Sequence, residues 1–270
     1  MSNLKEDYER LIQQTHKSAG MKIVHHYFDD AMSRMKTRSG LTKEEWITKH
    51  REKRYVQGMI RNHIENGRTE ASGLTSSFQR FSGCGSMTSQ IPMAIVDCIN
   101  AYGATTVLDP CAGWGSRLLG ATSQGCNYIG FDTNTTLEPV YKKMVEELPV
   151  LWNVHMKYED SAKADLSGLI YDMVYTSPPY WYAKNKYPQE RYEGMPEYSG
   201  MKEWVNNFLE PMFHNVMDNI QVGGRVCLNI PQESYEYLGL KCNEIRTLPT
   251  LGRRRAVKPD MVYVWYKPTI

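Results

Sequence analysis

The sequence Ser177-Pro178-Pro179-Tyr180 combines a hydroxyl, two prolines and an aromatic ring. It follows a strand-like run that begins at Tyr171. Proline has no backbone N–H to donate to a sheet, so the predicted strand has to stop at this point. The resulting turn is rigid and poor in hydrogen-bond donors, and aromatic residues stand at its mouth. Such a turn is suited to holding a flat ligand. The alternative is a strand end whose aromatic side chains return to the core.

A second candidate site lies in the sequence DPCAGWG, at residues 109–115. Asp109 ends a short apolar run, Gly113 and Gly115 lie in the turn, and a predicted helix follows at once. In an open parallel sheet, ligands bind beyond the carboxyl ends of the strands, where glycine permits close backbone approach and a helix N-terminus offers free N–H groups. The full GxGxxG dinucleotide pattern is not present, because Leu118 occupies the position of its third glycine.

Two further carboxylates follow the next predicted strands. Asp132 ends the next predicted strand after the glycine turn, where its carboxylate can accept hydrogen bonds from both hydroxyls of a ribose. Asp160 ends the following strand and could touch an adenine amino group, although Glu159 or Ser161 could serve equally. The alternatives are a turn-forming residue for Asp109, a helix N-cap for Asp132 and an exposed loop residue for Asp160. Together, Asp109 and Asp132 favour a nucleoside-type ligand.

The elements that must position these residues alternate along the chain from Ile91 onward. Strands are predicted at 105–110, 127–134, 154–160, 171–179, 223–231 and 261–268, and helices at 91–103, 115–125, 136–148 and 201–220. This alternation predicts an α/β fold with a mainly parallel sheet and helices on both faces. Residues 1–80 are predicted to form a helical N-terminal region for nucleic-acid or partner contacts, with helices at 3–17, 22–36 and 41–67. Residues 81–270 are predicted to form the catalytic domain.

The composition narrows the class of protein. The 270 residues are 41% hydrophobic and 23% charged, with a net charge of only +2, so a polyanionic partner would have to bind to a local basic patch. No apolar run approaches the roughly 18 residues of a membrane helix. The N-terminal sequence has no apolar signal-peptide core, and the six scattered cysteines indicate reduced thiols rather than a metal site. We therefore expect no membrane partner and no secretion. The location would be cytoplasmic in a bacterium, phage or virus, or nuclear in a eukaryote.

The two motifs, in this order, resemble those of S-adenosylmethionine-dependent DNA amino-methyltransferases, which are DPxxGxG for the cofactor and [DNS]PP[YFW] for catalysis. The segment TSQIPMAIVDCI resembles the family's remaining cofactor motif, and the resemblance covers roughly residues 86–230. It implies the Rossmann-like class I methyltransferase fold with a seven-stranded sheet, and S-adenosyl-L-methionine as the cofactor. The implied cofactor-binding residues are Thr88, Gln90, Pro92, Asp109, Pro110, Ala112, Gly113, Gly115, Asp132, Asp160 and Thr176.

The resemblance assigns catalysis to Ser177, Pro178, Pro179 and Tyr180. A flipped or unpaired base would stack on Tyr180, and its amino group would donate to Ser177 Oγ and to the Pro178 carbonyl. Ser at the first position is commoner among N4-cytosine enzymes than among N6-adenine enzymes, which favours cytosine slightly. C5 methylation is not expected, because its attacking cysteine needs a Pro-Cys context and the Pro110-Cys111 pair lies in the cofactor loop.

Two basic segments are candidates for contact with nucleic acid. The first follows the catalytic turn, and the second precedes the last predicted strand. The predicted contacts are Trp181, Lys184, Lys186, Arg191, Arg253, Arg254 and Arg255. Phosphate binding is one interpretation of these segments, and an ordinary solvated surface is the other.

Several functions stay open at this point. The expected partner is DNA, in a context such as restriction–modification, with RNA as the alternative and with either a monomer or a homodimer as the active form. A third candidate is methylation of a glutamine amide in a protein, but that chemistry normally has Asn where Ser177 stands. A non-catalytic subunit of a methyltransferase complex would usually have lost one motif, and both are present here.

Overall fold

The computed structural model describes residues 2–34, 40–65, 89–148, 153–181, 194–248 and 261–268. Its centre is a seven-stranded sheet with the strand order β3-β2-β1-β4-β5-β7-β6. Adjacent pairs from β3 to β5 are parallel, and β7 is antiparallel to both β5 and β6. The strands are β1 (Thr106–Asp109), β2 (Asn127–Phe131), β3 (Val154–Lys157), β4 (Met173–Thr176), β5 (Arg225–Asn229), β6 (Glu244–Thr247) and β7 (Met261–Tyr266).

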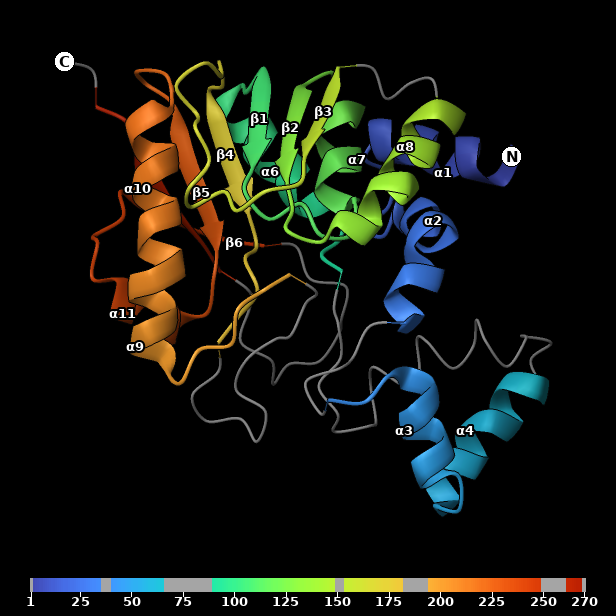
Figure 1. The fold of residues 1–270 in the computed structure, drawn as a ribbon. Helices are drawn as coiled ribbons and strands as arrows, with labels where there is room; N and C mark the ends of the chain where they lie inside the picture. The colour runs from blue at the N-terminus through green and yellow to red at the C-terminus, as the bar shows by residue number, and fades with distance from the viewer. Residues whose placement is uncertain are drawn as a thin grey trace.

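Helices cover both faces of this sheet, which confirms the predicted Rossmann-like class I methyltransferase fold (Figure 1). Successive strand residues point to opposite faces, so Val107 packs into one hydrophobic core and Leu108 into the other. The first core contains buried residues of α1 (Ser2–Ile12), α2 (Met21–Arg34), α6 (Met93–Tyr102), α7 (Ser116–Ser123) and α8 (Glu138–Glu147). The second contains buried residues of α9 (Met201–Trp204), α10 (Glu210–Asn219) and α11 (Gln232–Leu238).

The first two helices are part of the main hydrophobic core. Leu11 and Phe28 are fully buried in it, and Tyr8 donates to Thr122 of α7 at 3.3 Å. Tyr27 donates to Glu147 of α8 at 3.1 Å. The predicted division at residue 80 stays a prediction, but α1 and α2 pack as elements of the catalytic fold.

The predicted helix over 41–67 is two helices, α3 (Lys43–His50) and α4 (Arg54–Glu65). The expected N-cap is present, because Thr42 Oγ1 accepts from the backbone N–H of Glu45 and the Glu45 carboxylate accepts from the N–H of Thr42. Trp46 and Val56 form a small hydrophobic cluster of their own. This pair of helices therefore has a small hydrophobic cluster that is separate from the two cores of the sheet.

The predicted helix over 201–220 is also interrupted. A π-helical turn, η2 (Val205–Leu209), separates α9 from α10, and Pro211 lies in the first turn of α10. Proline lacks the N–H that a continuous α-helix would need there. The backbone hydrogen bonds just before it therefore follow the wider π-helical spacing. A short 3₁₀ turn, η1 (Thr135–Leu137), likewise leads into α8.

The described residues also bear on the expectations for membrane helices and for the cysteines. Among its helices, none combines the length and apolar character that crossing a membrane requires. The cysteines at 98, 111, 126, 227 and 242 are all free thiols, and Cys84 lies outside the described residues.

Candidate active site

A cavity of about 750 Å³ lies beyond the carboxyl ends of the parallel strands. Residues that follow β1, β2, β3 and β4, together with the last residue of β5, line it, which is where ligands bind in open parallel sheets. The cavity therefore unites the glycine turn and the Ser-Pro-Pro-Tyr turn, which are more than 60 residues apart in the sequence. The predicted residues that line it are Gln90, Pro110, Gly113, Asp132, Asp160, Ser177, Pro178, Pro179 and Tyr180.

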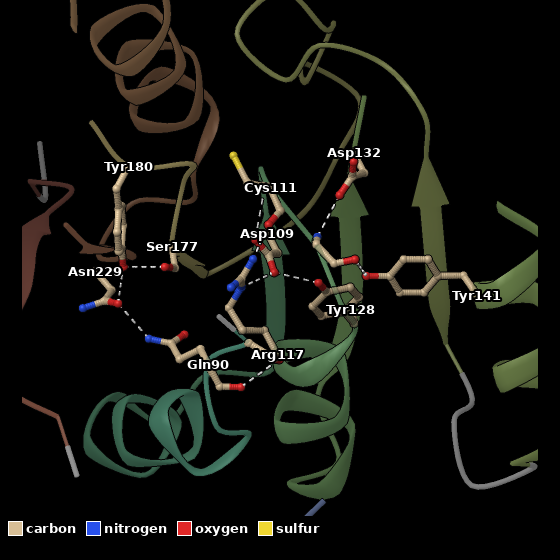
Figure 2. Close-up of polar contacts among 12 residues, drawn as sticks. Gln90, Asp109, Cys111, Arg117, Tyr128, Asp132, Tyr141, Ser177, Tyr180 and Asn229 are labelled. Atoms are coloured by element: carbon tan, nitrogen blue, oxygen red, sulfur yellow. Dashed lines mark hydrogen bonds and ion pairs between the residues drawn. The ribbon is translucent and has the colours of Figure 1, made fainter. Parts of the chain in front are cut away.

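Asp132 presents a carboxylate to the cavity from the end of β2. One oxygen accepts the backbone N–H of Gly113 at 2.8 Å (Figure 2). The other oxygen accepts the N–H of Asn134 at 2.9 Å. Burial raises the pKa of Asp132 to about 6, although these two hydrogen bonds oppose the shift. Each carboxylate oxygen has two lone pairs, so the group can still accept hydrogen bonds from a bound diol.

The glycine turn is held open by its packing against α2 and α8. Gly113 has φ +62° and its carbonyl accepts from Tyr141 of α8 at 3.0 Å. Gly115 has φ +72°, and a Cβ at this position would lie 2.7 Å from the ring of Phe28 in α2. Both residues thus occupy backbone conformations that favour glycine. Gly113 lines the cavity, whereas Gly115 does not.

Asp109 has a structural role that the sequence did not reveal. Its side chain is fully buried, and one oxygen accepts from Arg117 Nε at 2.6 Å and from the Tyr128 hydroxyl at 2.7 Å. The other oxygen accepts the N–H of Cys111 at 3.2 Å. Asp109 does not line the cavity, whereas its partner Arg117 does. The carboxylate therefore anchors the glycine turn to α7 (Figure 2), and its contact with the cofactor stays a prediction.

Cys111 also lines the cavity. Burial and the nearby Asp109 carboxylate raise the pKa of its thiol well above the ordinary value, and Arg117 only partly opposes them. A thiol in this state is protonated at neutral pH and is a poor nucleophile. This agrees with the expectation that the Pro110-Cys111 pair does not attack a base.

The Ser-Pro-Pro-Tyr turn is joined to β5 by a chain of hydrogen bonds. Ser177 Oγ lies 2.5 Å from the Tyr180 hydroxyl, which donates to Asn229 Oδ1 at 2.6 Å. Gln90 Nε2 donates to the same oxygen at 2.9 Å (Figure 2). Pro178 and Pro179 restrict the backbone between Ser177 and Tyr180, and all four residues line the cavity.

Other predicted site residues lie elsewhere. Pro92 packs against Gly20 and Gly120. Ala112 and Thr176 are fully buried, and none of these three residues lines the cavity.

Trp181 was expected to contact nucleic acid, but it is only 6% exposed and packs in the second hydrophobic core. Its ring therefore does not offer a surface to a partner. The predictions for Thr88, Lys184, Lys186, Arg191, Arg253, Arg254 and Arg255 fall outside the described residues.

Asp160 lines the cavity, and its contact with an adenine amino group stays a prediction. One of its oxygens accepts the backbone N–H of Ala162 at 3.0 Å, and the other pairs with the exposed Lys163 at 2.9 Å. Met195, Tyr198 and Phe208 also line the cavity, and the sequence analysis did not select them. Asn229 was missed as well, although a polar residue at the end of an apolar strand was a usable signal. In the described ranges, no group of three or more His, Cys, Asp or Glu side chains could hold a metal ion.

Comparison with known proteins gives weak structural similarities. No family model matches the sequence, and no curated protein matches it. TrmN from Thermus thermophilus has 18% identity and a TM-score of 0.47, with 71% of this chain and 52% of that chain covered. An RNA methyltransferase from Salinibacter ruber, in complex with S-adenosyl-L-homocysteine, has 16% identity and a TM-score of 0.41, with coverage of 67% and 94%. A SAM-dependent O-methyltransferase from Thermotoga maritima has 10% identity and a TM-score of 0.47, with coverage of 73% and 71%.

This chain thus spans about half the length of the TrmN chain. At these identities and TM-scores, the fold class rests on the strand order and the helices, and the site rests on the contacts within the cavity.

Proposed function

We propose that this chain transfers a methyl group from S-adenosyl-L-methionine to the exocyclic amino group of a base in DNA, with cytosine N4 favoured over adenine N6. The observation that carries the proposal is the single cavity that joins Asp132 to Ser177, Pro178 and Tyr180. One end offers acceptors for a nucleoside diol, and the other offers acceptors and a ring for a base. Its volume of about 750 Å³ lies within the roughly 300–1,000 Å³ range typical of ligand pockets.

The chemistry of the cavity residues fits the proposed cofactor. Asp132 keeps unused lone pairs on both oxygens and sits where the ribose of a nucleoside would donate two hydroxyls. Gly113 and Asp160 line the same cavity. When bound, S-adenosyl-L-methionine supplies an electrophilic methyl group, which the amino nitrogen accepts with release of one proton.

The residues at the other end orient the base. Ser177 Oγ and the Pro178 carbonyl accept the two amino hydrogens, and the proline ring fixes the backbone so that this carbonyl stays in place. The Tyr180 hydroxyl donates to Asn229, which holds the far end of the ring on which a base would stack. Orientation of this kind can account for several orders of magnitude in rate, because it replaces a bimolecular encounter by a prepared geometry.

The base and the polymer are the finer parts of the proposal. Cytosine is favoured because the turn begins with Ser177, and DNA is favoured because the two motifs resemble those of DNA amino-methyltransferases. RNA is the alternative polymer and an explicit outcome of the test.

The test is methyl transfer from tritiated S-adenosyl-L-methionine to DNA, to RNA and to a protein pool. Wild type should label DNA. Asp132→Ala should lose labelling at low cofactor concentration, and Ser177→Ala should lose it even when the cofactor is saturating. Asp165→Ala is the matched control, because this carboxylate is exposed, bonds only to Ser167 among the contacts described, and does not line the cavity. Labelling of RNA alone would reassign the polymer, and labelling of protein alone would overturn the proposal.

A further inference from the structure

Asn229, the last residue of β5, has a fixed orientation. Its Nδ2 donates to the backbone carbonyl of Met261 at 2.8 Å, at the start of the neighbouring strand β7. A backbone carbonyl can only accept, so the amide nitrogen has to face Met261. The amide oxygen Oδ1 must then face the cavity side, where Tyr180 and Gln90 meet it.

The fixed amide oxygen sets the direction of the next hydrogen bond. The Tyr180 hydroxyl lies 2.6 Å from Asn229 Oδ1, and an amide oxygen cannot donate. The single hydroxyl hydrogen of Tyr180 is therefore committed to Asn229. Gln90 must also present its amide nitrogen to this oxygen, because a second oxygen there would have no hydrogen to share.

The direction of the Tyr180 hydrogen bond also decides which group donates between Ser177 and Tyr180. Its Oγ lies 2.5 Å from the Tyr180 oxygen, whose own hydrogen is already used, so Ser177 has to be the donor in this contact. A serine hydroxyl has one hydrogen and two lone pairs. Once the hydrogen points at Tyr180, Ser177 Oγ can act only as an acceptor toward the cavity, in which it is half-buried.

We propose that Asn229 is a positioning residue that keeps Ser177 in an acceptor-only state through the Tyr180 hydroxyl, and that this state selects a target carrying an amino group. The inference rests on the proposed function and deepens it. A hydroxyl that could rotate would accept a hydrogen bond from an amino group or donate one to a keto oxygen, with little preference between them. With its hydrogen held away, Ser177 faces the base with lone pairs, so the amino groups of cytosine and adenine are favoured over the keto oxygens of thymine and guanine.

The discriminating pair of variants is Asn229→Leu and Asn229→Asp. Leucine has a similar size but removes the acceptor, so the Tyr180 hydroxyl donates to Ser177 instead and the Ser177 hydrogen is no longer held away from the cavity. We expect kcat to fall about 5- to 100-fold, which corresponds to one unsatisfied buried hydroxyl. Aspartate keeps an acceptor toward Tyr180 and should stay within about threefold of wild type. Cofactor affinity should be unchanged in both.

A merely structural role for Asn229 predicts the opposite order. Aspartate would then be the more harmful change, because it places a carboxylate oxygen against the Met261 carbonyl. Asn219→Leu is the matched control: this half-buried amide of α10 donates to the carbonyl of Asn215 and does not line the cavity. It should leave kcat unchanged. Equal activity of wild type and Asn229→Leu, or a lower activity for Asn229→Asp than for Asn229→Leu, would overturn the inference.

A second measurement covers the case in which Asn229→Leu does not fold. Tyr180→Phe removes the hydroxyl to which Ser177 donates, so it should lower the preference for an amino base. The probe is a DNA oligonucleotide with the base that wild type methylates, compared with the same strand carrying its keto counterpart (uracil for cytosine, hypoxanthine for adenine). Wild type should bind the amino form about 5- to 100-fold more tightly, and Tyr180→Phe should lose most of this ratio. An unchanged ratio would contradict the inference alone, whereas a wild type that methylates no base amino group would overturn the proposed function and the inference with it.

Discussion

Removal of the Asp132 carboxylate should weaken cofactor binding while leaving the sheet intact. Asp132 stands at the end of β2 and accepts the N–H groups of Gly113 and Asn134, with lone pairs left for a diol. Loss of its hydrogen bonds to the ribose should cost about 1–3 kcal/mol. That cost corresponds to a dissociation constant about 5- to 150-fold higher.

The pH dependence gives the same prediction an independent readout. Burial raises the pKa of Asp132 to about 6 in the free protein. Ribose hydroxyls donate hydrogen bonds and favour the ionised carboxylate, so binding should lower this pKa. Affinity should therefore be constant above pH 6 and should fall as the pH drops through 6, by at most about tenfold per pH unit for one proton. Asp132→Asn cannot ionise and should show no such fall.

Isothermal titration calorimetry with S-adenosyl-L-homocysteine between pH 5 and pH 8 measures both effects. Asp165→Ala serves as the control, because its carboxylate does not line the cavity. Thermal unfolding of each variant shows whether the Gly113 turn keeps its place after its acceptor is removed. A dissociation constant for Asp132→Ala equal to that of wild type, or a wild-type affinity that rises below pH 6, would refute the placement of the cofactor.

Three further predictions concern other parts of the molecule. Asp109→Ala should lower the free energy of unfolding by about 3–5 kcal/mol in urea titrations, because it leaves the buried Arg117 charge without its partner; a loss below 1 kcal/mol would contradict the anchoring role. Tyr180→Ala should reduce both turnover and binding of a DNA oligonucleotide, with stacking contributing about 1–3 kcal/mol, while Tyr180→Phe keeps the ring and should retain more activity; wild-type rates for Tyr180→Ala would exclude the turn from catalysis. Neutralising Arg253–Arg255 should flatten the salt dependence of DNA affinity by close to one log–log unit per phosphate contact without changing cofactor affinity, and an unchanged slope would assign these residues to the solvated surface.

The alternation of strands and helices could be predicted from the sequence because it depends on local patterns. Apolar runs such as 106–109 and 173–176 end in turn residues, and they became β1 and β4. The antiparallel strand β6 was not predicted as an element, because Glu244 to Thr247 alternate half-buried and exposed positions and carry little apolar character. Its pairing with β7 comes from tertiary context, which a single sequence does not display.

The helix interruptions show a similar limit. The run over 41–67 has continuous helical periodicity, and its break at residues 51–53 lies among exposed charged residues that carry no sequence signal for a turn. The break before Pro211 had such a signal, since proline inside a helical pattern marks a boundary or a distortion. Sequence periodicity therefore located these helices but did not fix their ends.

Motif spacing located the cavity but not the role of each residue in it. Asp109 and Asp132 both end strands, and nothing in their local sequence distinguishes the carboxylate that is fully buried from the one that faces the cavity. The difference depends on Arg117, eight positions later, which reaches back to Asp109. Asn229 likewise meets Tyr180 only because β5 lies beside β4 in the sheet.

The most direct test of the central claim is the identity of the methylated atom. DNA incubated with the full chain and S-adenosyl-L-methionine is digested to nucleosides, which are separated and identified by mass spectrometry against standards. The geometry at Ser177, Pro178 and Tyr180 predicts methylation on an exocyclic amino nitrogen, with N4-methyldeoxycytidine as the expected product. The product should be absent with Ser177→Ala and present with Asp165→Ala. Methylation solely at a base carbon, a ring nitrogen or a sugar oxygen would contradict the account.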